Sequence, residues 1–325
     1  MTTQRIEISS RTIVFTVFFL LALGLLWQIK DLIFSLLIAF IIAGALRPAV
    51  ATLEAVKLPR LIASIVVYFL FLFAFFYIFT LIVPPLTGEL TTLFKTLPQI
   101  ASVGLPSVSS YINFDFLSQN LPGLTNQTIE FIKGLFGNAI FITSTLFFGF
   151  YFILEKNLAE KLLGDLFEDI EVKKIAHISE RAQKRMSSWF WGEVALMFVV
   201  GILTYIGLTL FQIKYALALA VLAGLLEVIP TLGPIISAIP AVLIGASQSP
   251  VSGLSMVALY FIVQQLENNL VVPLIMKKVT GLHPITILVA LIIGGKLAGI
   301  LGVILAVPTT LLLETIIVEW QRLSR

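Results

Sequence analysis

The chain has 325 residues, of which 58% are hydrophobic and 12% are charged, and its mean hydropathy is +1.04. Soluble domains carry roughly 45–50% apolar and about 25% charged residues, so this composition excludes an ordinary soluble protein and indicates an integral membrane protein. The net charge is only +3, with lysine and arginine dispersed or mixed with acids, which excludes nucleic acid as a main partner.

The sequence also lacks the usual elements of an enzyme site. Because there is no cysteine, disulfides, thiolate catalysis and cysteine-ligated metals are excluded, and only His177 and His283 remain for an imidazole site. Neither an HExxH metal motif nor a GxxxxGK[ST] phosphate loop is present. We therefore expect neither an enzyme nor an ATP-driven motor, and no resident cofactor.

The first half of the chain predicts four membrane-spanning helices, because its apolar residues come in long runs rather than in the alternating strands of a barrel. The first is predicted as an uncleaved anchor, since it is longer than the apolar region of a signal peptide, about 7–15 residues. Residues 86–137 lose this hydrophobicity and predict an extramembrane segment. The four predicted spans are residues 12–29, 32–46, 61–83 and 138–154.

A charged segment follows the fourth span. Residues 155–185 contain seven basic and seven acidic side chains and predict amphipathic helices outside the membrane. The excess of lysine and arginine near span ends places this segment and both chain termini on the cytoplasmic side, and residues 86–137 outside. Residues 191–211 are then a fifth span that runs from inside to outside.

Beyond residue 211 the hydrophobic pattern is interrupted. Residues 215–246 contain Glu227 together with Pro230, Pro234 and Pro240. Broken helices persist in hydrocarbon only where protein or a wet cavity surrounds the freed backbone groups. Each half has about fifteen residues, fewer than the roughly twenty that a crossing needs, so the segment predicts a re-entrant hairpin entered from the outside.

A second span and a second interrupted segment complete the chain. Residues 254–276 predict a full span that ends at Lys277-Lys278 inside. Residues 284–293 are too short to cross, and Gly294-Gly295-Lys296 is predicted to break the helix before residues 299–318 return to the cytoplasm. This pattern predicts a second hairpin, entered from the inside.

These two units form a weak internal repeat. A shift of 68 residues places Tyr215 on His283, Ala238 on Ala306 and Pro240 on Pro308. Each unit is one span followed by one hairpin, and the charge rule gives them opposite directions, as in secondary transporters. The predicted fold is thus an all-α polytopic membrane protein with two re-entrant helical hairpins in an inverted repeat. Its predicted parts are a three-span scaffold (1–85), the outer segment (86–137), the fourth span with cytoplasmic helices (138–189), and a transport unit (190–325).

Two acids within the apolar half are the leading candidates for a binding site. Glu267 lies in a polar run with Gln264, Gln265 and Asn268, and its spacing from Gln264 and Asn268 predicts one shared helix face. An ionisable group at membrane depth costs at least about 2.5–3.5 kcal/mol, so Glu267 is expected to face a cavity or a partner. It is interpreted as a cation ligand or proton carrier, or alternatively as part of a polar clamp on the hairpins. Glu227 is either a second carboxyl of that site or a cap at the hairpin tip.

The remaining candidates lie at the predicted hairpin tips and their borders. Glycine and proline there are expected to shape the tips, and the freed backbone groups could bind a polar solute. Lys296 is either an ion-pair partner of Glu227 or Glu267 or a lysine that reaches water. His283 is either a pH-sensitive group or a turn residue. This set comprises Pro230, Thr231, Gly233, His283, Gly294, Gly295, Lys296 and Gly299.

The sequence resembles the bacterial autoinducer-2 exporter family in several motifs of its last third. They are Glu227-Val-Ile-Pro-Thr-Leu-Gly-Pro234, Gln264-Gln265-Leu-Glu267-Asn268, Leu282-His283-Pro284, Gly294-Gly295 and Gly299-Ile-Leu-Gly-Val-Ile-Leu-Ala-Val-Pro308. Carried over by position, the family's motif residues are Glu227, Pro230, Gly233, Pro234, Gln265, Glu267, Asn268, Pro273, His283, Pro284, Gly294, Gly295, Gly299 and Pro308.

The resemblance implies a protein of the bacterial cytoplasmic membrane that exports autoinducer-2 or similar small polar solutes. It also implies a homo-oligomer, a pentamer, and it includes relatives that exchange Na⁺ or Li⁺ for H⁺. Three hypotheses stay open. The chain is an exporter working by alternating access with Na⁺ or H⁺ as coupling ion, a cation/proton antiporter through Glu227 and Glu267, or an oligomeric passive pore or scaffold in the lipid bilayer.

Overall fold

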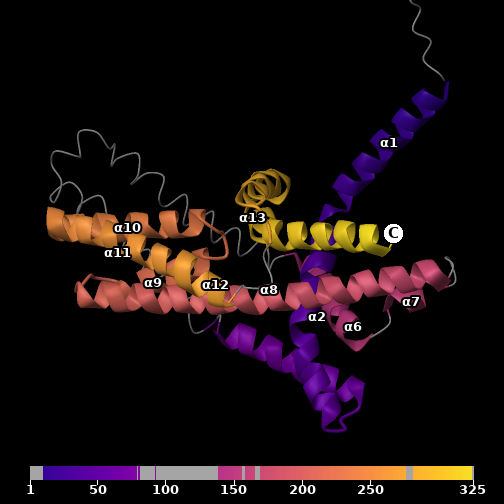
Figure 1. Ribbon diagram of the computed structural model, residues 1–325, viewed down its shortest axis with the longest axis horizontal. Coiled ribbons are helices and arrows are strands. Elements are labelled where there is room, and N and C mark those ends of the chain that lie inside the picture. The colour runs from indigo at the N-terminus through magenta and orange to yellow at the C-terminus, as the bar shows by residue number, and fades with distance from the viewer. Residues whose placement is uncertain are drawn as a thin grey trace, which may run out of the picture.

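The computed structural model describes residues 10–78, 138–155, 158–164, 169–275 and 281–323, together with Thr80 and Thr92. Every regular element in these residues is a helix, which confirms the predicted all-α class (Figure 1). The elements are α1 (Ser10–Gln28), α2 (Lys30–Ala55), the helix Arg60–Ile78, α6 (Ala139–Leu154), α7 (Leu158–Leu163), α8 (Asp169–Leu210), α9 (Ala216–Leu226), α10 (Leu232–Gln248), α11 (Pro250–Leu266), the π-helix η1 (Glu267–Val271), α12 (Val272–Ile275) and α13 (Pro284–Leu323).

Among the described residues, five helices are long and apolar enough to cross a membrane. They are Arg11–Gln28, Lys30–Ala55, Arg60–Ile78, Ile170–Leu210 and Pro284–Leu323. The second of these helices is longer than the predicted span 32–46, because α2 continues through Pro48. Thr52 Oγ1 donates a hydrogen bond of 3.0 Å to the carbonyl oxygen of this proline. The predicted outer segment 86–137 and the pair Lys277-Lys278 lie outside the described residues.

A scaffold forms where α2, the helix Arg60–Ile78 and α6 pack on one another. Its core contains Leu46 and Val50 of α2 and Ile153 of α6. Free carbonyls at the end of α6 accept hydrogen bonds from two arginines: Arg60 donates to Leu154 and Ile153, both at 2.7 Å, and Arg47 reaches the carbonyls of Phe152 and Glu155. These cationic donors satisfy the carbonyl groups that a helix end leaves without partners.

The long helix α8 connects the scaffold to the rest of the molecule. We predicted cytoplasmic helices over 155–185 and a separate span over 191–211, but the structure joins most of this stretch into one helix of 42 residues. No proline interrupts it, and its three glycines, Gly192, Gly201 and Gly207, all stay helical. In Figure 1, α8 runs across the whole molecule, with α9, α10 and α11 at one end and α7 at the other.

The first interrupted segment folds into a helical hairpin. The arms α9 and α10 pack against each other and, with α8 and α11, enclose an apolar core around Leu219, Ile244 and Met256. At the tip, Thr231 has a φ of 66°, and a Cβ at Gly233 would overlap the carbonyl oxygen of Leu226. Since α9 has only 11 residues, about 16 Å of helix, this arm is too short to cross a membrane alone.

The second interrupted segment is bent at a different place from the one predicted. Gly294-Gly295-Lys296 stays helical, and the break falls at Ala298 and Gly299, where Gly299 has a φ of 57°. Gly294 instead lies where the two arms of α13 cross. A Cβ on Gly302 would overlap the carbonyl oxygen of Gly294, so the backbones of the two arms are in close contact there. The two tip residues with positive φ, Thr231 and Gly299, are separated by the 68 residues of the sequence repeat.

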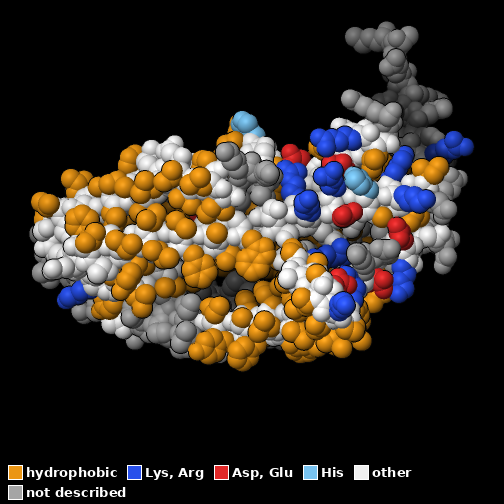
Figure 2. All heavy atoms as spheres, turned by 60° about the horizontal axis from the view of Figure 1, so that its bottom comes forward, with side chains coloured by type: hydrophobic (Ala, Val, Ile, Leu, Met, Phe, Trp, Pro, Cys, Tyr) orange, Lys and Arg blue, Asp and Glu red, His pale blue; other side chains and the backbone are white. Residues whose placement is uncertain are grey.

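Apolar and charged side chains occupy different ends of the surface. Figure 2 shows hydrophobic side chains over most of the half that holds α9, α10 and α11, whereas Lys, Arg, Asp and Glu gather at the opposite end. Exposed charged residues of the first half of α8, such as Lys173, Arg181 and Lys184, belong to this end. A membrane accommodates such a division, because hydrocarbon solvates the apolar part and water the charged part.

Candidate functional site

Two buried carboxyl groups meet where the tip of the first hairpin faces the π-helix. Glu227 ends α9 and is 3% exposed, and Glu267 begins η1 and is 5% exposed. Their side chains are within hydrogen-bonding contact of one another. Gln264, one turn before Glu267, donates its amide to Glu267 Oε2 at 2.9 Å. The structure thus brings together three of the predicted site residues.

A third buried acid, Glu193, belongs to the same cluster. It is 7% exposed, projects from α8 and lies close enough to interact electrostatically with both Glu227 and Glu267. Glu193 is not among the site residues that we predict from the sequence. A signal was available, because Glu193 lies inside the predicted span 191–211, and ionisable residues within spans are functional candidates by default.

No cationic side chain among the described residues forms an ion pair with these three acids. Glu227 Oε2 is buried and has no hydrogen-bond partner there. A carboxylate contains no donor, so a hydrogen bond between Glu227 and Glu267 requires a proton between them. A buried cluster of this kind can accept a proton or another small cation, because burying uncompensated charge is costly.

The π-helix changes which polar side chains share the site. Glu267 is buried, but Gln265, Asn268 and Asn269 are exposed, and the Asn269 amide donates 2.9 Å to the carbonyl of Gln265. The predicted common face of Gln264, Glu267 and Asn268 is therefore wrong for Asn268. The physical reason is that the wider π turn alters the angular spacing along the helix; such π segments occur frequently at functional sites.

The other residues of the first tip surround the acids without adding a charged group. Pro230 is half-buried and Thr231 is exposed, with no hydrogen bond from its side chain to the helix that it precedes. Gly233 is buried, and its N–H donates 2.9 Å to the carbonyl of Ile229. These residues therefore form the turn that presents Glu227.

The candidates of the second hairpin do not join the acid cluster. Lys296 is exposed and forms no ion pair with Glu227 or Glu267, so that predicted pairing is wrong. His283 is exposed, and its Nδ1 accepts a 3.3 Å hydrogen bond from the N–H of Ile285 at the start of α13. Gly294, Gly295 and Gly299 lie around the bend.

Comparison with known proteins supports a transport function. A family model described as "AI-2E family transporter" matches residues 13–322. The chain is 30% identical to "Putative transport protein YueF" of Bacillus subtilis, over 91% of this chain and 86% of that protein. It is 29% identical to "Putative transport protein YrrI" of the same species, over 96% and 94%. "Putative permease PerM" of Escherichia coli is 32% identical over 42% of this chain and 39% of its own length.

Proposed function

We propose that this chain, which belongs to the AI-2E transporter family, exports a small polar solute such as autoinducer-2 across the bacterial cytoplasmic membrane. Membrane transport is common to the family. The cargo, the coupling ion and the alternating-access mechanism are our proposal.

The observation that carries the proposal is the contact between Glu227 and Glu267 in an otherwise apolar half of the molecule. Secondary transporters bind their substrates and coupling ions where helices are interrupted, because the freed backbone groups and nearby acids provide polar ligands. Here a hairpin tip and a π-helix, two interruptions of regular helix, present one acid each. Glu193 brings in α8, so three separate elements converge on the acids.

A proton is the coupling ion that this geometry favours. The two carboxyl groups lie in contact, and a hydrogen bond between them would require one proton. Among the described residues, no group of three His, Asp or Glu side chains is arranged to hold a metal ion. We therefore propose that proton entry drives solute export, with the acid cluster alternately binding the proton and releasing it.

Flux measurements with purified protein in proteoliposomes test this function. Under an imposed proton gradient, the wild type should move autoinducer-2, and Glu267→Gln should reduce coupled flux at least about tenfold because the exchangeable proton is lost. Glu171→Gln is the matched control, since Glu171 is an exposed acid on the charged part of α8. Folded wild-type protein that moves no solute under either a proton or a sodium gradient would overturn the proposal.

Sodium/proton exchange is a second outcome that the same vesicles can reveal. Three buried carboxyl groups without a cationic partner could also accept Na⁺. In that case, adding sodium outside vesicles without any organic solute should alkalise the lumen, because Na⁺ enters as H⁺ leaves, and Glu267→Gln should abolish the signal. Solute flux without a sodium-driven pH change would assign the chain to proton-coupled export instead.

A further inference from the structure

An ion pair and two neighbouring polar contacts join α8 to the C-terminal part of α13, on the charged side of Glu193 along α8. Arg185 Nη2 lies 2.5 Å from Glu314 Oε2, and Arg185 Nη1 donates 3.1 Å to Thr315 Oγ1. Nearer the charged end, His177 Nε2 is 3.9 Å from Glu319 Oε2. These contacts hold the last turns of α13 against the part of α8 that we expect to face the cytoplasm.

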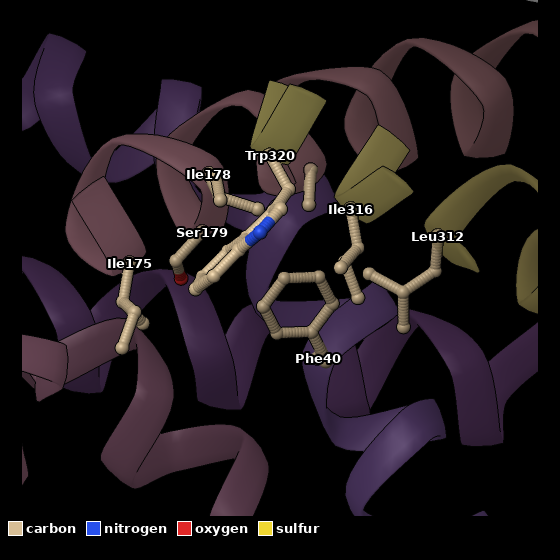
Figure 3. A pocket seen from close by; sticks show the side chains of 8 residues that line it. Phe40, Ile175, Ile178, Ser179, Leu312, Ile316 and Trp320 are labelled. Atoms are coloured by element: carbon tan, nitrogen blue, oxygen red, sulfur yellow. The ribbon is translucent and has the colours of Figure 1, made fainter. Parts of the chain in front are cut away.

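A cavity of about 280 Å³ lies beside these contacts (Figure 3). Figure 3 shows Phe40 of α2, Ile178 and Ser179 of α8, and Trp320 of α13 around it. This cavity is open to the surface on one side, so the C-terminal part of α13 has fewer apolar contacts there than a close-packed interior would give it.

Beyond the cavity, a plug of packed apolar side chains lies between it and Glu193. Met186 and Trp189 of α8 pack with Leu311 of α13 and with apolar residues of α2, and Phe40 and Leu312 belong both to the cavity wall and to this packing. Eight residues separate Arg185 from Glu193, about 12 Å along the helix. The interface between α8 and α13 therefore leads from the charged end towards the acid cluster and is closed by the apolar side chains of the plug.

The other end of this arm of α13 has a bend that can act as a pivot. Residues 300–323 follow Ala298 and Gly299, whose backbone leaves the helical conformation. A Cβ placed on Gly299 would meet no atom within 4 Å, so there is open space at this residue, although Gly302 crosses closely over Gly294 three residues further on. The arm thus has a pivot at one end, an ion pair near the other, and a cavity beside that ion pair.

We propose that residues 300–323 form a gate on the cytoplasmic side, which the Arg185–Glu314 ion pair holds closed over the route to Glu193. This inference rests on the proposed transport function. When the pair separates, the arm turns about Gly299, the plug at Trp189 and Leu311 opens, and the acid cluster becomes accessible from the cytoplasm. Closure of the same arm isolates the cluster while the opposite side opens.

Thiol accessibility tests the gate without any measurement of transport. The chain has no cysteine, so Glu193→Cys introduces a single thiol at the site. A charged, membrane-impermeant thiosulfonate is applied to inside-out vesicles, whose outer face is the cytoplasmic side. Adding Glu314→Gln should raise the modification rate about fivefold or more, because the closed state loses its ion pair. The charge exchange Arg185→Glu with Glu314→Arg should return the rate to its starting value.

The control uses an ion pair inside the scaffold. Arg60 Nη1 lies 3.2 Å from Glu54 Oε2, and neither residue belongs to α8 or α13. Glu54→Gln should leave the modification rate at position 193 unchanged. If Glu314→Gln leaves this rate unchanged, or if the charge exchange leaves it raised, the gate is refuted.

A covalent lock provides the second test. Arg185→Cys with Glu314→Cys replaces the ion pair by two thiols that a cleavable bifunctional thiosulfonate can join. Joining them should reduce solute flux at least tenfold, and reduction with dithiothreitol should restore it. Flux that continues unchanged after complete cross-linking would overturn the gate and leave the transport function standing. Accessibility that responds as expected in a protein without any flux would overturn the transport function and leave the gate standing.

Discussion

At the scale of single residues, the acid cluster is unusual because it is buried without a cationic partner among the described residues. Glu227 Oε2 has no hydrogen-bond partner there, and the ion pairs of the described residues all lie outside the cluster. A buried acid that serves structure is normally paired, since breaking a buried pair leaves an uncompensated charge. An acid that serves transport must instead stay available for a proton or a solute.

This difference predicts that Glu193→Gln reduces transport without reducing stability. Because the amide replaces a buried acid that has no ion-pair partner among the described residues, the midpoint of thermal unfolding should not fall. Proton-coupled flux should drop by about tenfold or more, because the cluster loses one of three ionisable groups. Both quantities can be measured on one detergent-purified sample, by scanning fluorimetry and after reconstitution.

The comparison with Glu171→Gln on the same helix shows whether the effect depends on position. That exposed substitution should change neither quantity. A fall in unfolding temperature for Glu193→Gln with normal flux would show that Glu193 is a structural residue.

At the scale of elements, close backbone contact determines the shape of the second hairpin. Gly294 and Gly302 approach so closely that neither has room for a side chain. In α10 and α13 the prolines at 240 and 308 are both buried inside the second arm of their hairpin. The hairpins therefore share their architecture, with a positive-φ tip, a buried proline and a tight crossing.

Gly302→Ala should destabilise the protein, because the new methyl group would overlap the carbonyl oxygen of Gly294 and force the arms apart. Overpacking of this kind costs typically about 1–3 kcal/mol. Loss of thermal stability in detergent is the measurement.

The matched control is Gly24→Ala in α1, where a Cβ would meet no atom within 4 Å. Replacing an exposed helical glycine by alanine favours the helix by roughly 1 kcal/mol, so this variant should be at least as stable as the wild type. Equal losses in the two variants would show that the crossing at Gly302 has no special role.

At the scale of the whole molecule, α8 contributes side chains to two apolar cores and passes through two chemical environments. Its exposed charged residues lie at one end, and Glu193 and the core shared with α9, α10 and α11 lie towards the other. The first arm of the first hairpin, α9, is too short for a crossing, which is the reason why we predict a re-entrant segment there.

Labelling from one side of the membrane tests that topology. The residues Gln212 and Ser249 flank the first hairpin, so a re-entrant hairpin requires both to face the same side. Gln212→Cys and Ser249→Cys should each react with an impermeant maleimide added to whole cells, without permeabilisation. Reaction of only one of the two would show that the segment crosses the membrane.

Much of the fold could be predicted because its causes are local. Long apolar runs predicted the helices, and proline and glycine marked the interrupted segments. The exact bend in α13 could not be predicted, since four glycines lie near it and the position that leaves the helix depends on how the two arms pack, as at the contact between Gly294 and Gly302. Similarly, the π-helix at Glu267 depends on packing around α11, so the sequence placed Asn268 on the wrong face.

The sequence by itself determined the helical class, the apolar composition and two of the three buried acids, because hydropathy and helix breaking act over a few neighbouring residues. Only the tertiary structure decided that Glu193 joins Glu227 and Glu267 and that Lys296 does not. Which side chains meet depends on how α8 packs against the hairpin and the π-helix, and such contacts between distant residues have no signature in a single sequence.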